Sequence, residues 1–257
     1  MAGEERVVIV TGSATGVGAA TARRLAGRGW RVVVNFTRSE AEARETAEAC
    51  RAAGAEALLV RADVAEDADC RRLAGAALEA WGRLDALVNN AGVTRFAAHH
   101  DLDALAAADF QRLYAVNVVG AYQMIRACAP ALKRQGAGAV VNVSSIAGVT
   151  GMGSSVAYAA SKAALNNLTV TLARALGPEI RVNAVCPGMI EGRWLREGLG
   201  EAVYERTRER YRASAPLRRT ATPDDVAETI AWLVEGAPLV TGELLLVDGG
   251  MHVALPR

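Results

Sequence analysis

The stretch VVIVTGSATGVGAATARRLAGRG, residues 7–29, decides the fold, because a short apolar run passes through a glycine-rich turn into a helical pattern. Residues 7–10 predict a buried strand, and the residues from about 16 onward predict a helix. Gly12, Gly16 and Gly18 allow a sharp turn and a close approach of the backbone to a ligand. The start of the helix offers unpaired N–H groups and a positive dipole end, which suit phosphate. The same glycines are also compatible with an ordinary strand-to-helix turn that binds no ligand.

Six further short apolar runs alternate with longer alanine-rich, charge-bearing segments. The runs are residues 32–34, 57–60, 86–88, 139–143, 181–185 and 244–247. The helical segments are about 16–28, 39–53, 66–81, 103–134, 155–177 and 223–235. Strands that alternate with helices predict an α/β class protein, in which a seven-stranded parallel sheet carries helices on both faces. We therefore expect a single-domain Rossmann fold over residues 1–257, whose first turn binds a dinucleotide.

Thr222 and Pro223, followed by two aspartates, mark the start of the last helix. One segment breaks the alternation. Residues 189–215 form an arginine-rich and aromatic stretch that is too long for an ordinary connection. A substrate lid and a plain helical insertion on the surface both account for it, and we favour the lid.

Composition excludes several classes of partner. The chain has 29 basic and 28 acidic residues, so no overall field selects nucleic acid or an anionic membrane. No apolar stretch approaches the roughly 20 residues of a membrane span. The four cysteines lie far apart without a CxxC pair or a nearby histidine, and we expect reduced structural thiols and no metal site. These features predict a soluble cytoplasmic protein.

The end of the second strand bears on cofactor choice. It reads VNFTRS over residues 34–39, and no acid is available for a ribose 2′-hydroxyl. Arg38 offers a guanidinium to a 2′-phosphate, with Thr37 and Ser39 as hydroxyl donors. We expect NADP(H) to be favoured over NAD(H). In the alternative reading, Arg38 only solvates the start of the next helix.

Tyr158 and Lys162 stand four residues apart in the segment YAASK, so both project from one helix face. A positive neighbour favours the phenolate, and the pair therefore suggests a tyrosine that exchanges protons. A buried tyrosine beside a solvated lysine is the alternative.

Taken together, these segments resemble the classical short-chain dehydrogenase/reductase family over nearly the whole chain. The resemblance rests on residues 11–18, the NNAG segment at 89–92, Asn117, Ser145, Tyr158 with Lys162, and Pro187 with Gly188. Within the family the chain is most similar to the 3-oxoacyl-acyl carrier protein reductase group. The segments VVVNFTRSE and VTGELLLVDGGM also resemble glucose dehydrogenases.

The resemblance implies a catalytic set of four residues. Tyr158 would be the acid/base, and Lys162 would lower its pKa and bind the nicotinamide ribose. Ser145 would hold the substrate oxygen, a role for which Ser144 is the adjacent candidate. Asn117 would bind a water that extends the proton path from Lys162. No metal is implied.

The resemblance also implies a set of contacts to the cofactor. These residues are Gly12, Ser13, Thr15, Gly16, Val17, Gly18, Arg38, Asp63, Val64, Asn90, Ala91, Gly92, Tyr158, Lys162, Pro187, Gly188 and Ile190. Asp63 could equally cap a helix, and Asn90 could equally support the sheet. Two positions depart from the family pattern: Thr15 replaces a basic residue, and Gly192 replaces a threonine that binds the carboxamide. Backbone groups near Met189 and Ile190 would then bind the carboxamide.

The substrate pocket is expected to be lined by Thr94, Phe96, Ala147, Met152, Met189 and Trp194. Apolar walls with Arg95 and Arg193 at the rim suit a ketone with a carboxylate, thioester or phosphopantetheine-like tail. Ion pairs on helix surfaces explain the lid arginines equally well. An acidic carrier protein would need an exposed basic patch, which Lys133 and Arg134 supply only in part.

These features predict an NADPH-dependent oxidoreductase that reduces a ketone to a secondary alcohol, with a 3-oxoacyl thioester as one candidate. An alcohol or sugar dehydrogenase that works in the oxidative direction is the alternative, and a non-catalytic nucleotide sensor is an alternative of another class. By family resemblance we expect a homotetramer or homodimer, built through the helices at about 109–134 and 155–177 and the last strand.

Overall fold

The seven apolar runs form one parallel sheet in the computed structural model, which describes residues 6–254. Its strands follow the order β3-β2-β1-β4-β5-β6-β7. Their bounds are β1 (Val7–Val10), β2 (Arg31–Phe36), β3 (Ala57–Arg61), β4 (Ala86–Asn89), β5 (Gly138–Val143), β6 (Ile180–Pro187) and β7 (Leu244–Val247). The expected α/β class and the seven-stranded parallel sheet are confirmed.

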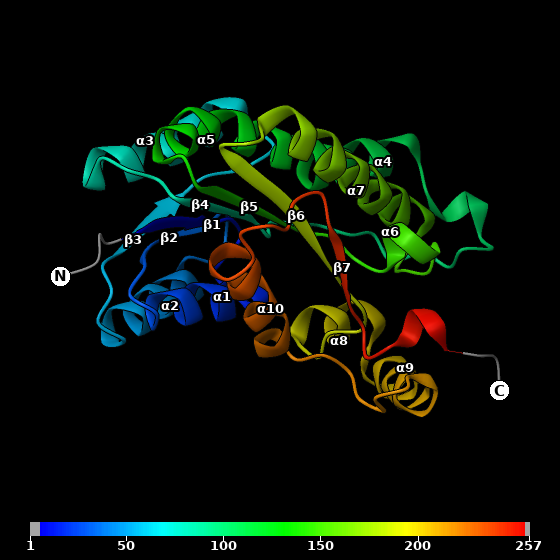
Figure 1. Ribbon diagram of the computed structural model, residues 1–257. Helices are drawn as coiled ribbons and strands as arrows, with labels where there is room; N and C mark the ends of the chain where they lie inside the picture. The colour runs from blue at the N-terminus through cyan, green and yellow to red at the C-terminus, as the bar shows by residue number, and fades with distance from the viewer. Residues whose placement is uncertain (1–5, 255–257) are drawn as a thin grey trace.

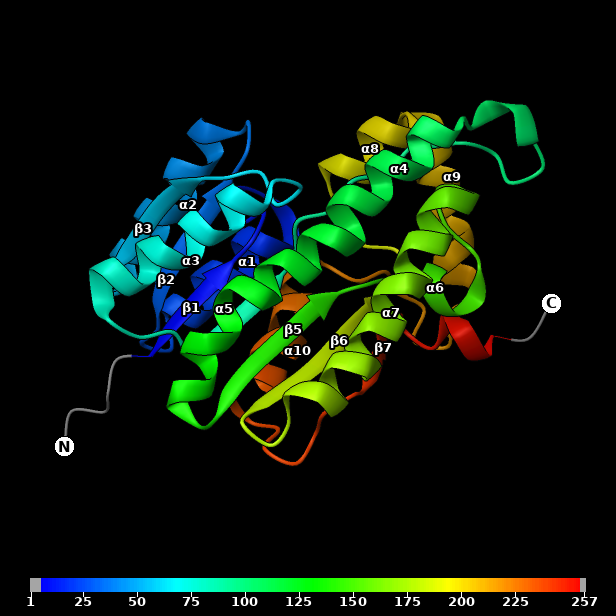
Figure 2. The same ribbon diagram turned by 90° about the horizontal axis from the view of Figure 1, so that it is seen from above.

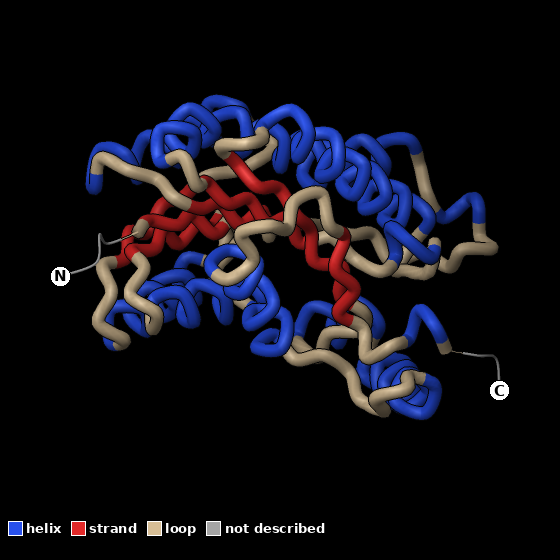
Figure 3. The backbone as a smooth tube through the Cα atoms, in the orientation of Figure 1, coloured by secondary structure: helices blue, strands red, loops and turns tan. Residues whose placement is uncertain are grey.

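Helices cover both faces of the sheet (Figures 1 and 3). One layer holds α1 (Gly16–Ala26), α2 (Glu40–Ala52) and α10 (Pro223–Glu235). The other holds α3 (Asp67–Trp81), α5 (Ala121–Gln135) and α7 (Val156–Leu176). Shorter elements are α4 (Ala107–Tyr114), α6 (Ala147–Thr150), α8 (Arg193–Leu199) and α9 (Glu201–Ser214), with 3-10 turns at Leu102–Ala104 and Met251–Val253. The three-layer Rossmann fold follows from these elements.

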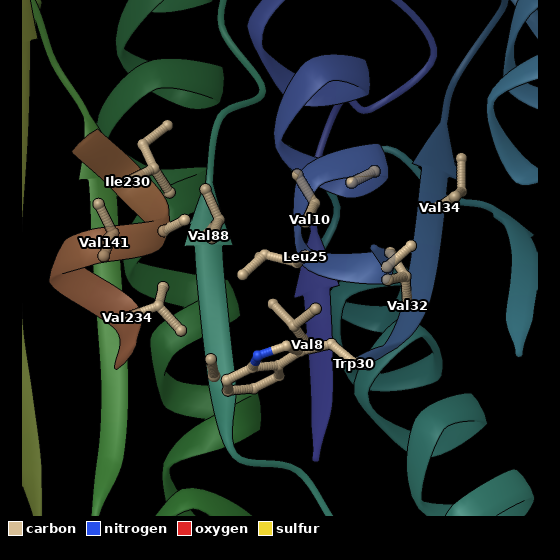
Figure 4. Packing of buried hydrophobic residues seen from close by; sticks show 14 of the residues in the cluster. Val8, Val10, Leu25, Trp30, Val32, Val34, Val88, Val141, Ile230 and Val234 are labelled. Atoms are coloured by element: carbon tan, nitrogen blue, oxygen red, sulfur yellow. The ribbon is translucent and has the colours of Figure 1, made fainter. Parts of the chain in front are cut away.

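Alternate residues of each strand enter two separate cores. Val8 and Val10 of β1 face α1 and α10, whereas Val7 and Ile9 face α3 and α5. Figure 4 shows the first core, in which valines of β1, β2, β4 and β5 pack against Leu25 of α1 and against α10. All four residues of β1 are fully buried. Burial on both faces explains why the strands read as continuous apolar runs.

A buried polar chain crosses the second core. The Asn89 side chain of β4 donates to Asn142 of β5, and the Asn142 side chain donates to Thr169 of α7; both hydrogen bonds are 2.9 Å long. These hydrogen bonds satisfy the Asn142 side chain and the Asn89 NH2 group, which would otherwise be costly to bury, whereas the Asn89 side-chain oxygen has no partner among the described residues. They fix the register of two strands against the helix that carries Tyr158 and Lys162.

The long helix expected at 103–134 is interrupted, and this prediction was wrong in detail. Ala106 is extended, and the Asp109 carboxylate accepts its N–H, so α4 begins only at Ala107. Between α4 and α5 lies a π-helical turn at Ala115–Gly120. The start of α10 is confirmed: the Thr222 hydroxyl accepts the Asp225 N–H, and the Asp225 carboxylate accepts the Thr222 N–H.

The segment at 189–215 is helical rather than irregular. It folds into α8 and α9, which lie beyond the carboxyl ends of β6 and β7 (Figures 1 and 2). A small core beneath them contains Met189, Tyr204, Tyr211 and Ala215. The four cysteines are buried and free. Within residues 6–254, no helix is long and apolar enough to cross a membrane.

Candidate active site

The strand order places a crevice at the centre of the carboxyl edge of the sheet. β1 pairs with β2 on one side and with β4 on the other, although β4 is far away in the sequence. The connections from β1 and β4 therefore leave in opposite directions, and ligands bind at such a switch point. The glycine loop follows β1 and the NNAG segment ends β4, so both meet at this crevice.

A side chain would be unfavourable at two glycines of the loop, for reasons that differ between them. Gly16 has a φ of +58° and nothing within 4 Å of the place where a Cβ would be. A Cβ at Gly18 would lie 2.4 Å from the Asn90 amide and 2.6 Å from the Gly12 carbonyl oxygen. Gly18 therefore permits close packing inside the protein, whereas Gly16 keeps the outer surface of the loop open.

Hydrogen bonds tie the glycine loop to the NNAG segment. The Thr11 hydroxyl accepts the N–H groups of Asn90 and Ala91, each at 3.0 Å. The Asn90 amide donates to the carbonyl oxygens of Thr11 and Gly12, each at 2.9 Å. The expected structural role of Asn90 is thus present. Its contact with a cofactor stays a prediction, as do those of Ala91 and Gly92, which flank the crevice.

Asn35 is a second anchor, and the sequence reasoning missed it. The side-chain oxygen of Asn35 accepts the Gly12 N–H at 2.9 Å, and the side-chain NH2 group of Asn35 donates to the Ala62 carbonyl at 3.0 Å. Ser13 is fully buried, and its hydroxyl donates to Val10 and accepts the Asn35 N–H. The hydroxyl of Ser13 is therefore committed to the loop itself. The sequence feature that could have revealed Asn35 is its place as the single amide residue in the mainly apolar strand β2.

The start of α1 has the properties of a phosphate cradle. Thr15, the residue that precedes the helix, makes no side-chain capping bond, and the first turn contains no acid. The first N–H groups of a helix lack partners within it and attract anions. Thr15 and Gly16 are exposed, and Val17 is half-buried. The open surface at Gly16 and this uncapped helix end fit a dinucleotide.

The outer edge of the crevice carries the residues expected to bind adenosine. Arg38 is exposed and forms no ion pair with any residue in the described range 6–254. The Thr37 hydroxyl donates to Ala62 at 3.3 Å. Asp63 accepts the Ala65 N–H at 3.0 Å, and so caps a turn rather than the helix α3. The Val64 carbonyl accepts the Gln123 amide at 2.9 Å.

Tyr158, Ser145 and Lys162 lie together at the carboxyl end of β5. Lys162 is 4% exposed; its ammonium donates to the Val143 carbonyl at 2.9 Å and lies 5.7 Å from the centre of the Tyr158 ring. The Ser145 hydroxyl accepts the Ala147 N–H at 3.1 Å. The Ser144 hydroxyl donates to the Lys162 carbonyl from a buried position. Ser145 is the more exposed serine, and it is the one that interacts with the Tyr158 phenol.

Burial controls the charges of this pair. It raises the pKa of Tyr158 to about 12, and a hydrogen bond with Ser145 offsets part of the rise. Burial also lowers the pKa of Lys162 to about 8. The expectation that Lys162 lowers the tyrosine pKa is not met in this structure. The ammonium lies 5.7 Å from the ring centre and donates to the Val143 carbonyl, and desolvation is the largest cause of the tyrosine pKa shift.

Asn117 lies at the π-helical turn and is almost fully buried. Its side chain accepts the Val93 N–H at 2.9 Å, and donates to Val93 and to Ser161, each at 3.0 Å. The amide therefore fixes the chain after NNAG to the helix that carries Tyr158. π-helical turns often occur at functional sites because they disturb the regular backbone hydrogen bonds. The binding of a water at Asn117 stays a prediction.

Aromatic side chains form the outer wall beside Tyr158. The Trp194 ring centre lies 6.2 Å from that of Tyr158 and 6.1 Å from that of Phe96. Phe96 packs so closely on Gly198 that a Cβ there would lie 1.9 Å from its ring. Of the expected pocket residues, Trp194 therefore lies beside Tyr158 and is half exposed, and Phe96 packs against Trp194.

The other expected pocket residues divide into two groups. The Thr94 and Ser154 hydroxyls are hydrogen-bonded at 2.5 Å, and Met152 is 52% exposed on the loop before α7. Ala147 and Met189 are buried, at 2% and 8% exposed, and offer little surface to a ligand.

The end of β6 is held by internal contacts. A Cβ at Gly188 would lie 1.9 Å from the Tyr211 hydroxyl, which donates to the Asp248 carbonyl. Pro187 is buried within the strand, and Ile190 forms a parallel bridge with Ala221. Gly188 is therefore required by Tyr211 whether or not it also meets a cofactor.

Comparisons with known proteins agree with this geometry. A family model described as enoyl-(acyl carrier protein) reductase matches residues 12–252. Ketoacyl reductase 2 of the granaticin polyketide synthase from Streptomyces violaceoruber is 48% identical over 250 residues, covering 97% of each chain. L-rhamnose 1-dehydrogenase (NAD(P)(+)) from Azotobacter vinelandii is 40% identical over 257 residues, covering 98% of each. The structure of a short-chain dehydrogenase/reductase from Burkholderia xenovorans has a TM-score of 0.91 and 42% identity, covering 98% of this chain and 99% of its own.

The fold and the site define an NAD(P)-dependent oxidoreductase built on a Rossmann fold. The chain belongs to the classical short-chain dehydrogenase/reductase family, close to the 3-oxoacyl-acyl carrier protein reductase group.

Gly16→Ala tests whether the open surface of the loop receives the dinucleotide. Gly29→Ala is the matched control, because Gly29 also has a left-handed φ, of +82°, with nothing within 4 Å, and precedes β2 at the opposite edge of the sheet. Both variants should lose about 1 to 2 kcal/mol of unfolding free energy. Only Gly16→Ala should weaken NADPH binding, measured by calorimetric titration. Equal binding by the two variants would argue against the loop as the cradle.

Proposed function

We propose that this protein is an NADPH-dependent reductase that converts a ketone to a secondary alcohol, with Tyr158 as the proton donor. The observation that carries the proposal is the half-buried Tyr158 beside the buried Lys162, with Ser145 near the phenol, at the carboxyl edge of the sheet. A β-ketoacyl thioester is the proposed substrate class, because a ketoacyl reductase is 48% identical to this chain.

The residues of the site divide the work of a carbonyl reduction. When bound, the nicotinamide supplies the hydride that the carbonyl carbon accepts. The Ser145 hydroxyl holds the substrate oxygen, and Tyr158 gives it a proton as negative charge develops there. Tyr158, with its pKa raised to about 12, is protonated at neutral pH, which is the form that reduction requires. Lys162 contributes a positive charge near the phenol at neutral pH and orients the ribose.

Arg38 supports the preference for NADPH. The first turn of α2 contains two acids, and both have arginine partners: Glu40 pairs with Arg44 at 2.5 Å, and Glu42 pairs with Arg193 at 3.3 Å. Arg38 has no such partner in the described part of the chain, so its charge is available to a 2′-phosphate. Ser39 precedes the helix without a capping bond and adds a hydroxyl.

The pocket walls favour a substrate with a sizeable apolar part. Trp194 lies beside Tyr158, Phe96 packs against Trp194, and Met152 is exposed at the rim. We propose that α8 and α9 act as the lid. A sugar or alcohol dehydrogenase is the second candidate, since L-rhamnose 1-dehydrogenase is 40% identical to this chain. Initial rates with β-keto thioesters, cyclic ketones and sugars, each with NADPH or the oxidised cofactor, separate the two.

The assembly proposed is a homotetramer or homodimer in the cytoplasm. Val119 and Tyr122 are exposed side chains three positions apart near the start of α5, within the helical region proposed for assembly, and their burial between copies would be favourable.

The pKa of Lys162 predicts how the reduction depends on pH. Because burial lowers this pKa to about 8, Lys162 is charged below pH 8 and loses its charge as the pH rises further. Tyr158 stays protonated throughout, since its pKa is raised to about 12. We expect kcat/KM for ketone reduction to be level near pH 7 and to fall about tenfold per unit well above pH 8. A level profile up to pH 10 would contradict the role of Lys162.

Arg38→Asp tests the proposed cofactor preference. The exchange removes the guanidinium and introduces the acid that suits a ribose 2′-hydroxyl. The ratio of kcat/KM for NADPH to that for NADH should favour NADPH in the natural protein, and should fall at least about tenfold in the variant. Arg174→Asp is the control, because Arg174 is an exposed arginine near the distal end of α7. Equal use of both cofactors by the natural protein would refute the preference.

A further inference from the structure

We propose that Arg193, at the start of α8, is a positioning residue for cofactor choice that acts by neutralising Glu42 of α2. The proposal rests on the proposed preference for NADPH and adds a second residue to it. Arg193 lies in the segment that we interpret as a substrate lid. Its partner lies across the crevice, on the helix that follows Arg38.

The contact joins two parts of the chain that are 151 positions apart. The two terminal nitrogens of the Arg193 guanidinium lie 3.3 and 3.4 Å from the same Glu42 oxygen. Its Nε lies 3.6 Å from Glu197 within α8. The Arg193 side chain is 60% exposed and that of Glu42 is 35% exposed, so water screens the pair. The pair is therefore a local correction of charge rather than a source of stability.

Glu42 lies where an uncompensated charge would matter. With Thr15 and Gly16 it lines a cavity beside the phosphate cradle, whose other charged lining residues are Arg23, Glu45 and Asp224. It also lies in the first turn of α2, one helical turn beyond Arg38. A backbone hydrogen bond at its own residue, assisted by Arg193, lowers the pKa of Glu42, which therefore stays ionised at neutral pH.

The positive charge that neutralises Glu42 comes from Arg193 in α8 rather than from a basic residue of α2. Glu40, the neighbouring acid, pairs with Arg44 on its own helix. For Glu42, the basic partner within the described residues 6–254 is Arg193. Without it, a carboxylate would face the phosphates of the cofactor. A 2′-phosphate adds nearly two negative charges, so NADPH would be penalised more than NADH.

A purely mechanical role for the same ion pair makes a different prediction. If the pair only held α8 against α2, its loss would release the lid and weaken both cofactors to a similar degree. If it acts through charge, the loss of Arg193 should affect NADPH selectively. Removal of the Glu42 charge should then restore the balance.

The experiment measures dissociation constants for NADPH and NADH by calorimetric titration, without a ketone substrate. The variants are Arg193→Gln, Glu42→Gln, and the two combined. Arg196→Gln is the matched control, because Arg196 lies on α8 but pairs with Glu201 inside the lid segment. Arg193→Gln should raise the constant for NADPH roughly three- to tenfold and that for NADH less than about twofold. The double variant and the control should keep the natural ratio.

Three results would overturn the proposal. Equal weakening of both cofactors by Arg193→Gln would assign the pair to lid closure. Failure of Glu42→Gln to restore the ratio in the double variant would mean that Arg193 meets the cofactor directly. Failure of the proposed function itself is distinguishable, because Arg38→Asp would then leave the cofactor ratio unchanged. If Arg38→Asp shifts the cofactor ratio but Arg193→Gln does not, the role of Arg193 is contradicted and the proposed preference for NADPH is not.

Discussion

Parallel pairing of β1 with β4 is the constraint on which the rest of the site depends. The pairing brings the glycine loop beside the NNAG segment, and the hydrogen bonds of Thr11 and Asn90 hold the two together. β5 pairs with the other edge of β4, so Ser145 comes next in line. The chain of Asn89, Asn142 and Thr169 then ties α7 to these strands. A change in this strand order would separate the phosphate cradle from the tyrosine.

Burial shifts the pKa values of Tyr158 and Lys162, which this arrangement brings together, in opposite directions. It raises the pKa of Tyr158 and lowers that of Lys162, because the charged form of each group is disfavoured away from water. The Trp194 ring of α8 lies beside the same tyrosine, and Phe96 packs on the other side of Trp194.

The strands, the main helices and the proximity of Ser145, Tyr158 and Lys162 could be predicted from the sequence. Buried parallel strands are continuous apolar runs, and the motif residues are linked to chemistry by family resemblance. The π-helical turn at Ala115–Gly120 could not be predicted, since no residue type marks it. Nor could the tyrosine pKa, because desolvation depends on packing by distant segments. Asn35, Ser13 and Gly188 show a related difficulty: residues near a ligand site also serve the backbone around it. The ion pair between Glu42 and Arg193 required the three-dimensional fold.

The most direct test of the central claim is the turnover of Tyr158→Phe, measured beside its NADPH affinity. Tyr122→Phe is the control, because it removes the hydroxyl of an exposed tyrosine on α5. The account predicts that kcat for reduction of a β-keto thioester falls by about 100-fold or more in Tyr158→Phe. NADPH affinity should stay within about twofold of the natural value, since one hydrogen bond contributes little net free energy. Turnover that survives the loss of this hydroxyl would contradict the account.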